Sequence, residues 1–261
     1  MRFGQAADNI TMSWATAEEG RGFRGMSTKT PSSNTSVGLR TVGEQRRVPE
    51  GVAKFVDGLC RSALGRSASV QEIAEVADSI EKTGDRRSAV QSVLVMEEAL
   101  VRLAEPWFWK LLSRGAQEKE MGDFVGSVRS GTPFDAAISR VIGSEQYIER
   151  ASRRGIGGEG EVNLLQSIHI DLLGRLAETG EVSRALKQIR AVGAARYALA
   201  ILRSVEFRRD FLLRLHHELL ERTPGEADMA GWLKRENLGL DLLAVRVHLL
   251  AGDEYFNRVA R

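Results

Sequence analysis

The chain has 261 residues, of which 43% are hydrophobic and 28% are charged, a composition typical of a soluble globular protein of one or two domains. Its net charge of +2 and isoelectric point near 8.8 are too balanced to indicate nucleic acid binding, which usually requires a concentrated basic stripe. The only cysteine, Cys60, excludes an intrachain disulfide and a multi-thiolate metal site. Its place between Leu59 and Arg61 on an expected helix predicts a small buried or half-buried side chain.

Membrane and export signals are missing from the sequence. It holds no run of about 18 apolar residues, so we expect no membrane span. The N-terminus lacks a basic region followed by an apolar core, so no ordinary secretory signal is expected. The cytoplasm is therefore the default expectation, with export to the cell surface by a non-classical route left open.

Residues 1–50 differ in composition from the rest of the chain. The stretch Ser27–Val37 is polar, and Gly20–Gly25 is basic and rich in glycine. Such a composition buries too little apolar surface to offset the entropy of ordering, so we expect a disordered N-terminal arm, which could become ordered on a partner. As an alternative, translation begins at Met26 and the first 25 residues do not belong to the native protein.

From Val52 onward the apolar residues recur at helical spacing. A first helix is expected from Val52 to about Leu64, and a second from Val70, capped by Ser69 and ended by Gly84. A third helix is predicted from about Arg87 to Leu103. We expect the next helix to begin at Pro106, because proline suits a first helical turn.

The same pattern occurs four times. In each copy an arginine follows a leucine by two positions, a glycine comes 17 or 18 residues after the arginine, and a buried type of residue comes 32 or 33 residues after it. The arginines are Arg66, Arg114, Arg175 and Arg222; the glycines are Gly84, Gly131, Gly193 and Gly239; the last positions are Ala99, Tyr147, Phe207 and Tyr255. The spacing from Arg66 to Arg114 gives a unit of about 48 residues. A repeated unit of this length predicts an all-α repeat protein, built from three-helix units that must stack to bury a core.

Each recurring residue has an expected structural role. The arginines are expected to hold carbonyls at helix C-termini, and the glycines to allow a tight reversal after the second helix. The aromatic residues are expected to fill the seam to the next unit.

A glycine-rich and charged stretch divides the four copies into two pairs. We predict an arm at 1–50, a helical module of two half-repeats at 51–152, a linker at 153–161 and a second such module at 162–261. The offset between the modules is near 108, as the pairs Arg114 and Arg222 and Tyr147 and Tyr255 show.

The repeats resemble those of a known family. The residues that carry the likeness are Leu172–Arg175, Ser204–Phe207, Leu219–Pro224, Trp232, Asp253–Tyr255 and, in part, Ser144–Tyr147. From about Val52 to Arg261 the chain is similar to an uncharacterised bacterial helical repeat domain of exported and surface-layer proteins, related to the phycobilisome linker domain. The first copy departs from the family pattern, because it ends in Met96–Ala99 without an aromatic residue. The resemblance implies an all-α scaffold that joins or docks proteins.

No catalytic constellation stands out. The stretch Gly155–Gly160 satisfies G-x-G-x-x-G, but a helical segment precedes it where the dinucleotide fingerprint requires a strand. In His216-His217-Glu218 the neighbouring histidines point about 100° apart, so they are poorly placed to bind one metal, and we expect the histidines to be solvated or at the edge of the core. We predict no enzyme activity, no cofactor and no metal.

Six residues are candidates for partner binding. Trp107, Trp109 and Trp232 are of the type enriched at binding hot spots, although core packing is the alternative for Trp232. Trp107 and Trp109 cannot face the same side of a helix, so one of them is expected to be exposed.

The other three candidates, Arg184, Lys187 and Arg190, belong to an arginine-rich segment that also contains Arg196, Arg203, Arg208 and Arg209. This segment forms either a basic face or an ordinary solvated surface interspersed with Glu178, Glu181 and Glu206.

The predicted function is a non-enzymatic assembly or linker protein that binds protein partners in a larger complex through its repeat faces and its arm. The alternative is a module that binds carbohydrate or a cell surface through exposed aromatic residues. An enzyme of a kind without a recognisable motif is a third class.

Overall fold

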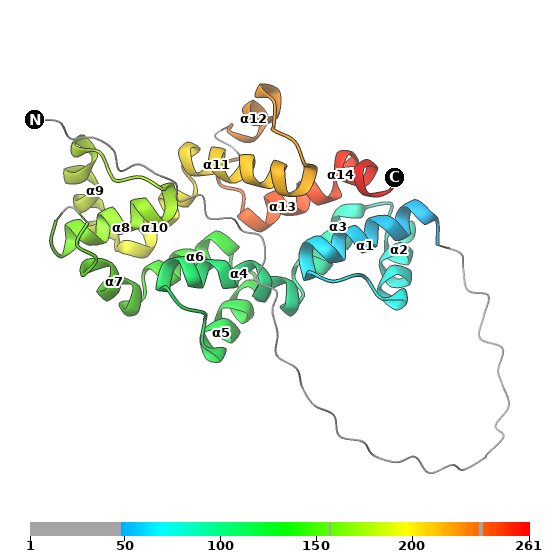
Figure 1. The fold of residues 1–261 in the computed structure, drawn as a ribbon, viewed down its shortest axis with the longest axis horizontal. Helices are drawn as coiled ribbons and strands as arrows, with labels where there is room; N and C mark the ends of the chain where they lie inside the picture. The colour runs from blue at the N-terminus through cyan, green and yellow to red at the C-terminus, as the bar shows by residue number, and fades with distance from the viewer. Residues whose placement is uncertain (1–47, 157, 235–236) are drawn as a thin grey trace, which may run out of the picture. The chain divides into compact units, whose positions relative to one another are not determined.

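The computed structural model describes residues 48–156, 158–234 and 237–261, and in this part of the chain it is helical throughout, without a strand (Figure 1). The all-α prediction is confirmed. The helices are α1 (Glu50–Leu64), α2 (Val70–Thr83), α3 (Arg86–Leu94), α4 (Glu97–Leu112), α5 (Glu118–Arg129), α6 (Phe134–Ile142), α7 (Glu145–Ser152), α8 (Glu161–Leu173), α9 (Thr179–Val192), α10 (Ala194–Leu202), α11 (Val205–Leu215), the π-helical segment η1 (His216–Leu220), α12 (Glu226–Trp232), α13 (Leu242–Ala251) and α14 (Asp253–Val259). The predicted arm, apart from its last three residues, lies outside the described residues.

Local sequence signals set many of the helix ends. At the start of α2, the Ser69 hydroxyl accepts a hydrogen bond from the Glu72 N–H at 3.2 Å, and the Glu72 carboxylate accepts one from the Ser69 N–H at 2.8 Å. The helix ends at Gly84, whose φ of 66° lies in the left-handed region that glycine adopts without strain. The predicted cap at Ser69 and stop at Gly84 are therefore confirmed.

The predicted helix from Arg87 to Leu103 is wrong, because the chain breaks between α3 and α4. α4 begins at Glu97, where two carboxylates in the first turn favour a helix N-terminus. Pro106 consequently lies inside α4 and does not begin a helix. Its missing N–H removes one hydrogen bond within the helix, a cost that the buried residues of α4 outweigh.

We number the four repeats units 1 to 4, after Arg66, Arg114, Arg175 and Arg222. In units 2 and 4 the first helix is continuous: α4 in unit 2, and α11 followed by η1 in unit 4. In unit 3 the corresponding stretch is divided into α7 and α8, which pack against each other. Unit 1 starts with α1 alone, and α14 at the other end of the sequence packs against it, so that α14 and α1 together correspond to α7 and α8 (Figure 1).

Contacts also join the two predicted modules. α13 packs against α3, and α10 packs against α6, so units 1 and 4 are neighbours and so are units 2 and 3. Residues 46–261 form one compact unit by their contacts. A division into separate modules at 51–152 and 162–261, with a linker at 153–161, is not confirmed and stays a prediction.

The four repeated seam positions are buried. Ala99, Tyr147, Phe207 and Tyr255 are at most 1% exposed. Tyr255 of α14 lies against Phe55 of α1, with their ring centroids 6.1 Å apart in an edge-on arrangement. Three of the four repeated glycines have a positive φ. Gly239 does not, although it lies in a turn after α12. None of the helices in the described residues is both long and apolar enough to cross a membrane.

Candidate protein-interaction site

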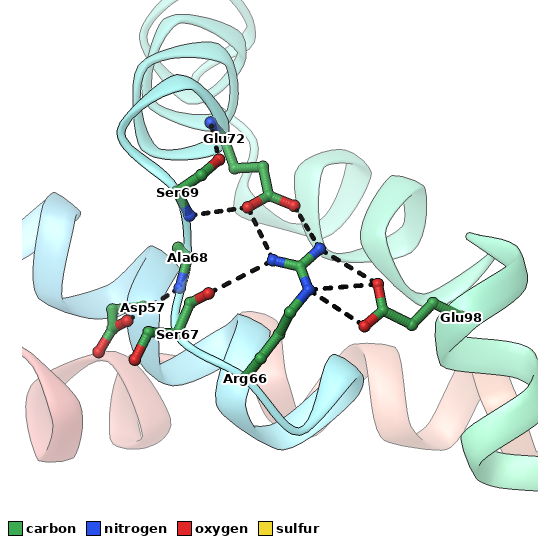
Figure 2. Close-up of polar contacts among 7 residues, drawn as sticks. All are labelled: Asp57, Arg66, Ser67, Ala68, Ser69, Glu72 and Glu98. Carbon is green, nitrogen blue, oxygen red and sulfur yellow. Dashed lines mark hydrogen bonds and ion pairs between the residues drawn. The ribbon is translucent and has the colours of Figure 1, made fainter. Parts of the chain in front are cut away.

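Each repeated arginine lies at the centre of a polar cluster, which Figure 2 shows for Arg66. Arg66 donates to both oxygens of Glu72 at 3.0 and 2.8 Å, and its Nε donates to Glu98 at 3.1 Å. Its Nη1 also donates to the Ser67 carbonyl at 3.3 Å. The arginine thus ties the turn after α1 to the start of α2 and to the start of α4.

The other three units repeat this arrangement. In each, the arginine binds an acid six residues later, the carbonyl of the next residue, and a side chain 31 or 32 residues later. The six-residue partners are Glu120, Glu181 and Asp228, and the distant partners are Gln146, Glu206 and Glu254. The predicted role of the arginines at helix C-terminal carbonyls is wrong in detail, because the carbonyls they bind belong to the turn residues Ser67, Gly115, Leu176 and Thr223.

The residue before each arginine explains this direction. Gly65, Ser113, Gly174 and Glu221 have φ values of 74°, 57°, 71° and 54°. A left-handed residue ends the first helix and turns the chain, so the next side chain points across the turn toward the start of the second helix. The sequence holds a signal for this turn, since two of the four positions are glycine.

The arginines and carboxylates of these clusters form ion pairs with one another. The hydrogen bond from Arg66, together with the Ser69 N–H, lowers the pKa of Glu72 to about 2. Arg175 and the Glu178 N–H likewise lower the pKa of Glu181 to about 2. These carboxylates remain charged at neutral pH and already have partners, so the repeated motif stabilises the fold and does not offer a free site.

Part of the arginine-rich segment forms ion pairs inside the molecule. Arg203 donates to the fully buried Asp135 at 2.8 Å, and Arg208, only 3% exposed, donates to the same carboxylate at 3.3 Å. Arg190 pairs with Glu161 at the surface. Arg203 and Arg208 therefore connect the C-terminal end of α10 and the helix α11 to α6. Because Arg208 is buried, neither a basic face nor an ordinary solvated surface, the two alternatives left open by the sequence, describes it.

Two of the histidines are more buried than predicted. His169 and His216 are 3% and 2% exposed, so they are neither solvated nor at the edge of the core. His169 lies 2.7 Å from the Tyr197 hydroxyl, and burial lowers its imidazole pKa. His216 Nδ1 lies 2.8 Å from the Leu212 carbonyl. Among the described residues, no group of three or more His, Cys, Asp or Glu side chains is placed to hold a metal.

The remaining sequence candidates are placed as follows. The stretch Gly155–Gly160 lies between two helices, α7 and α8, and so lacks the strand that a dinucleotide fingerprint requires. Cys60 is buried, as predicted, and burial raises the pKa of its thiol to about 11.

The six candidate partner-binding residues lie on three different helices. On α4, Trp109 is 56% exposed, whereas Trp107 is half-buried against Phe207, which confirms that only one of the two faces solvent. Trp232 on α12 is half-buried, with its ring edge-on to His248 at 4.8 Å. The exposed Arg184, Lys187 and Arg190 lie on α9.

Sequence reasoning missed a groove between α11 and α12. It has a volume of about 690 Å³ and is lined by Val205, Arg209, Leu213, Pro224, Gly225, Glu226, Met229, Ala230, Leu233 and Lys234. The sequence does hold a signal for it at the first position of the repeated helices. That position is Glu97, Glu145 and Asp253 in α4, α7 and α14, but Val205 in α11, where the valine is 46% exposed.

A second, smaller hollow of about 540 Å³ lies on the corresponding face of α4, where Glu97, Val101 and Glu105 form one wall. Leu64 of α1 and Glu98 and Arg102 of α4 complete it. Glu98 already pairs with Arg66, so part of this hollow belongs to the unit 1 cluster.

No family model matches this chain, and no curated protein or solved structure matches it either. The family resemblance described above therefore rests on the quoted sequence motifs alone.

Proposed function

We propose that this protein is a non-enzymatic assembly or linker protein, which binds protein partners through surfaces where its repeat units differ. The observation that carries the proposal is the contrast between repeated and non-repeated residues. The repeated arginines, acids and aromatic residues bind one another or are buried. The exposed apolar side chains Trp109 and Val205, in contrast, lie at positions where the units differ.

Exposed apolar groups at such positions favour protein binding. A large aromatic side chain loses much apolar surface to a partner at a low cost in conformational entropy, which is why tryptophan is common at hot spots. Trp109 shares α4 with the half-buried Trp107, so it sits on a rigid helix and not on a loop. A partner that covers Trp109 would therefore meet a preformed surface.

Crosslinking in native cells, followed by purification of the full chain, tests the proposal. We expect crosslinks to one or a few defined proteins, and we expect Trp109→Ser or Val205→Glu to remove at least one of them. Arg61→Ala, which removes an exposed side chain from the i,i+4 pair with Asp57, serves as the control and should leave every crosslink in place. A chain that is recovered only as a monomer without a stable partner contradicts the proposal.

The exposed indole of Trp109 also supports a second candidate, a carbohydrate- or cell-surface-binding module. Sugar rings stack on flat aromatic faces, and the Trp109 ring lies beside Gly115, where no side chain covers it. A glycan array at normal and low salt tests this candidate. Binding that disappears in Trp109→Ala would favour it over the assembly role, and an array without binding would remove it.

A further inference from the structure

The α11–α12 groove marks a departure of unit 4 from the other units. In units 1 to 3 the second helix packs against the first, as α2 does on α1, α5 on α4 and α9 on α8. Among the described helices, none packs this closely against α12. The space that a close helix pair would fill is therefore open in unit 4.

The walls of the groove are apolar and regularly spaced. Val205, Arg209 and Leu213 follow one another at four-residue intervals, so they form a ridge of about 12 Å along α11. On the facing side, α12 contributes Met229, which is 8% exposed, and Leu233 lies four residues further along, just after the end of α12. A groove two helical turns long matches two apolar side chains spaced four residues apart on another helix.

Two cations stand at the rim of the groove. Arg209 and Lys234 are both exposed, and neither side chain has an ion pair or hydrogen bond to any described residue. This differs from the repeated arginines, which all have carboxylate partners. Glu226 is the only acid in the lining, so the groove carries a net positive charge. A segment with carboxylates beside its apolar face would complement it.

We propose that the α11–α12 groove binds an amphipathic helix of a partner protein, with apolar residues on one face and acidic residues beside them. The inference rests on the proposed function and names the site and the chemistry of the partner. Val205 and Leu213 meet the apolar face, Met229 and Leu233 cover its other side, and Arg209 and Lys234 pair with the carboxylates. The charged pairs lie at the rim, so they select the partner more than they strengthen binding.

Defined peptides test the groove while the natural partner is unidentified. Three labelled 15-residue helical peptides are compared by fluorescence anisotropy with the full chain: one with leucines four residues apart and glutamates beside them, one with the glutamates replaced by lysines, and one with the leucines replaced by serines. We expect the leucine–glutamate peptide to bind at least tenfold more tightly than either of the others. At high salt we expect the difference in affinity between the leucine–glutamate and leucine–lysine peptides to disappear, because salt screens the charges at the rim. The difference in affinity between the leucine–glutamate peptide and the serine peptide should remain.

Variants of the chain make the test specific. Val205→Glu gives α11 the acid that the other units have at this position, so it should fold normally and weaken binding of the leucine–glutamate peptide at least tenfold. The double variant Arg209→Glu with Lys234→Glu should reverse the preference toward the leucine–lysine peptide. Lys119→Glu with Arg129→Glu makes the same change of charge at two exposed positions of α5 and should leave the preference unchanged.

The remaining outcomes separate this inference from the proposed function. Equal binding of the peptides to the parent chain and to Val205→Glu overturns the groove. Self-association in sedimentation that Val205→Glu abolishes also overturns it, because the occupant is then a second copy of the chain. If native crosslinks persist in Val205→Glu, the assembly function stands and the groove does not, whereas a chain without any crosslink overturns the function itself.

Discussion

The junction of α7 with α8 and the junction of α14 with α1 bring together the same repeat positions but differ in the residues that form the contact. Tyr147 and Tyr255 occupy the same repeat position. The hydroxyl of each lies within hydrogen-bond distance of a side chain four residues before a repeated arginine. Tyr147 donates to the buried carboxylate of Asp171 at 2.9 Å, whereas the Tyr255 hydroxyl lies 3.0 Å from that of Ser62. Two arginines complete the first junction, where Arg154 donates to Asp171 at 2.7 Å and Arg150 at 3.2 Å.

The difference follows from how the helices are connected. Residues 153–160 join α7 to α8 directly, so these helices stay close together even if the contact between them is weak. A buried carboxylate, which is costly to desolvate, is tolerable there because two arginines and a tyrosine surround it. α14 reaches α1 from the far end of the sequence, and that junction relies on apolar contacts of Tyr255 with Phe55 and of Phe256 with Phe55, 5.4 Å apart. The repeat thus determines which helix positions come into contact, but the side chains that stabilise the contact differ between the two junctions.

Truncation of the two tyrosines should have the largest effects and should break the similarity between the junctions. Tyr147→Ala removes a fully buried ring from the middle of the chain and is expected to lower the free energy of unfolding by about 3–5 kcal/mol. Tyr255→Ala should lower it less, by about 2–3 kcal/mol, because the seven-residue α14 can detach without unfolding the remaining helices. Urea unfolding of both variants measures the difference.

Cys60 reports on the same comparison. Its thiol is buried on α1, and burial raises its pKa to about 11, so alkylation in the native protein should be slow. Detachment of α14 in Tyr255→Ala should speed alkylation at least tenfold, whereas Tyr147→Ala under native conditions should not. An equal rate in both variants would show that α14 does not protect α1.

Removal of the two hydrogen-bond partners of the tyrosines should have effects smaller than that of Tyr147→Ala. Asp171→Ala leaves Arg150 and Arg154 without their carboxylate and is expected to cost about 3 kcal/mol. Ser62→Ala removes one neutral hydrogen bond and is expected to cost about 1 kcal/mol. Thermal unfolding at neutral pH measures both. Similar costs for the two would mean that the charged network contributes no more than the hydroxyl pair.

The smallest expected effect concerns pH. Arg222 lowers the pKa of Glu254 below its ordinary value of 4.5, whereas the corresponding position in α7 is Gln146, which does not titrate. A carboxyl whose pKa is lower in the folded state stabilises the protein above pH 4.5, and this contribution is lost as the pH falls through the folded pKa. Glu254 is half-exposed, so Glu254→Gln should cost less than about 1 kcal/mol at pH 7 and nothing at pH 2.

Gln146→Glu is the reciprocal variant and should gain a similar amount above pH 4.5 through Arg114. Unfolding curves measured between pH 2 and pH 7 test both variants together. If the curve of Glu254→Gln runs parallel to that of the parent chain, the ion pair makes no pH-dependent contribution.

Much of the local structure could be predicted from the sequence. The helical class, the cap at Ser69 and the exposure of one residue of the Trp107 and Trp109 pair all follow from spacing and propensity, which act within a few residues. The partners of the repeated arginines could also have been predicted from the sequence. Each distant partner directly precedes a buried seam residue, and at three of the four positions it is an acid: Glu98, Glu206 and Glu254.

The non-local features could not be predicted in the same way. Periodicity shows which face of a helix is apolar but not which helix covers it, so nothing in α14 or α1 alone indicates that Tyr255 lies against Phe55. The α11–α12 groove depends on how closely α12 approaches α11, which is a matter of packing and not of pattern. The sequence signal for the groove is Val205, an apolar residue at a position where the corresponding helices α4, α7 and α14 have an acid.

The closeness of α14 to α1 has a consequence for the order of the units. Lys54 Nζ donates to the Arg261 carbonyl at 2.8 Å, so the last residue lies beside the first turns of α1. A short peptide could therefore connect Arg261 to the residue before α1, while the chain is opened between α7 and α8. Such a circular permutant would run through units 3, 4, 1 and 2, turn the α14–α1 junction into the linked one, and leave Tyr147 and Asp171 to hold their helices without a connecting loop.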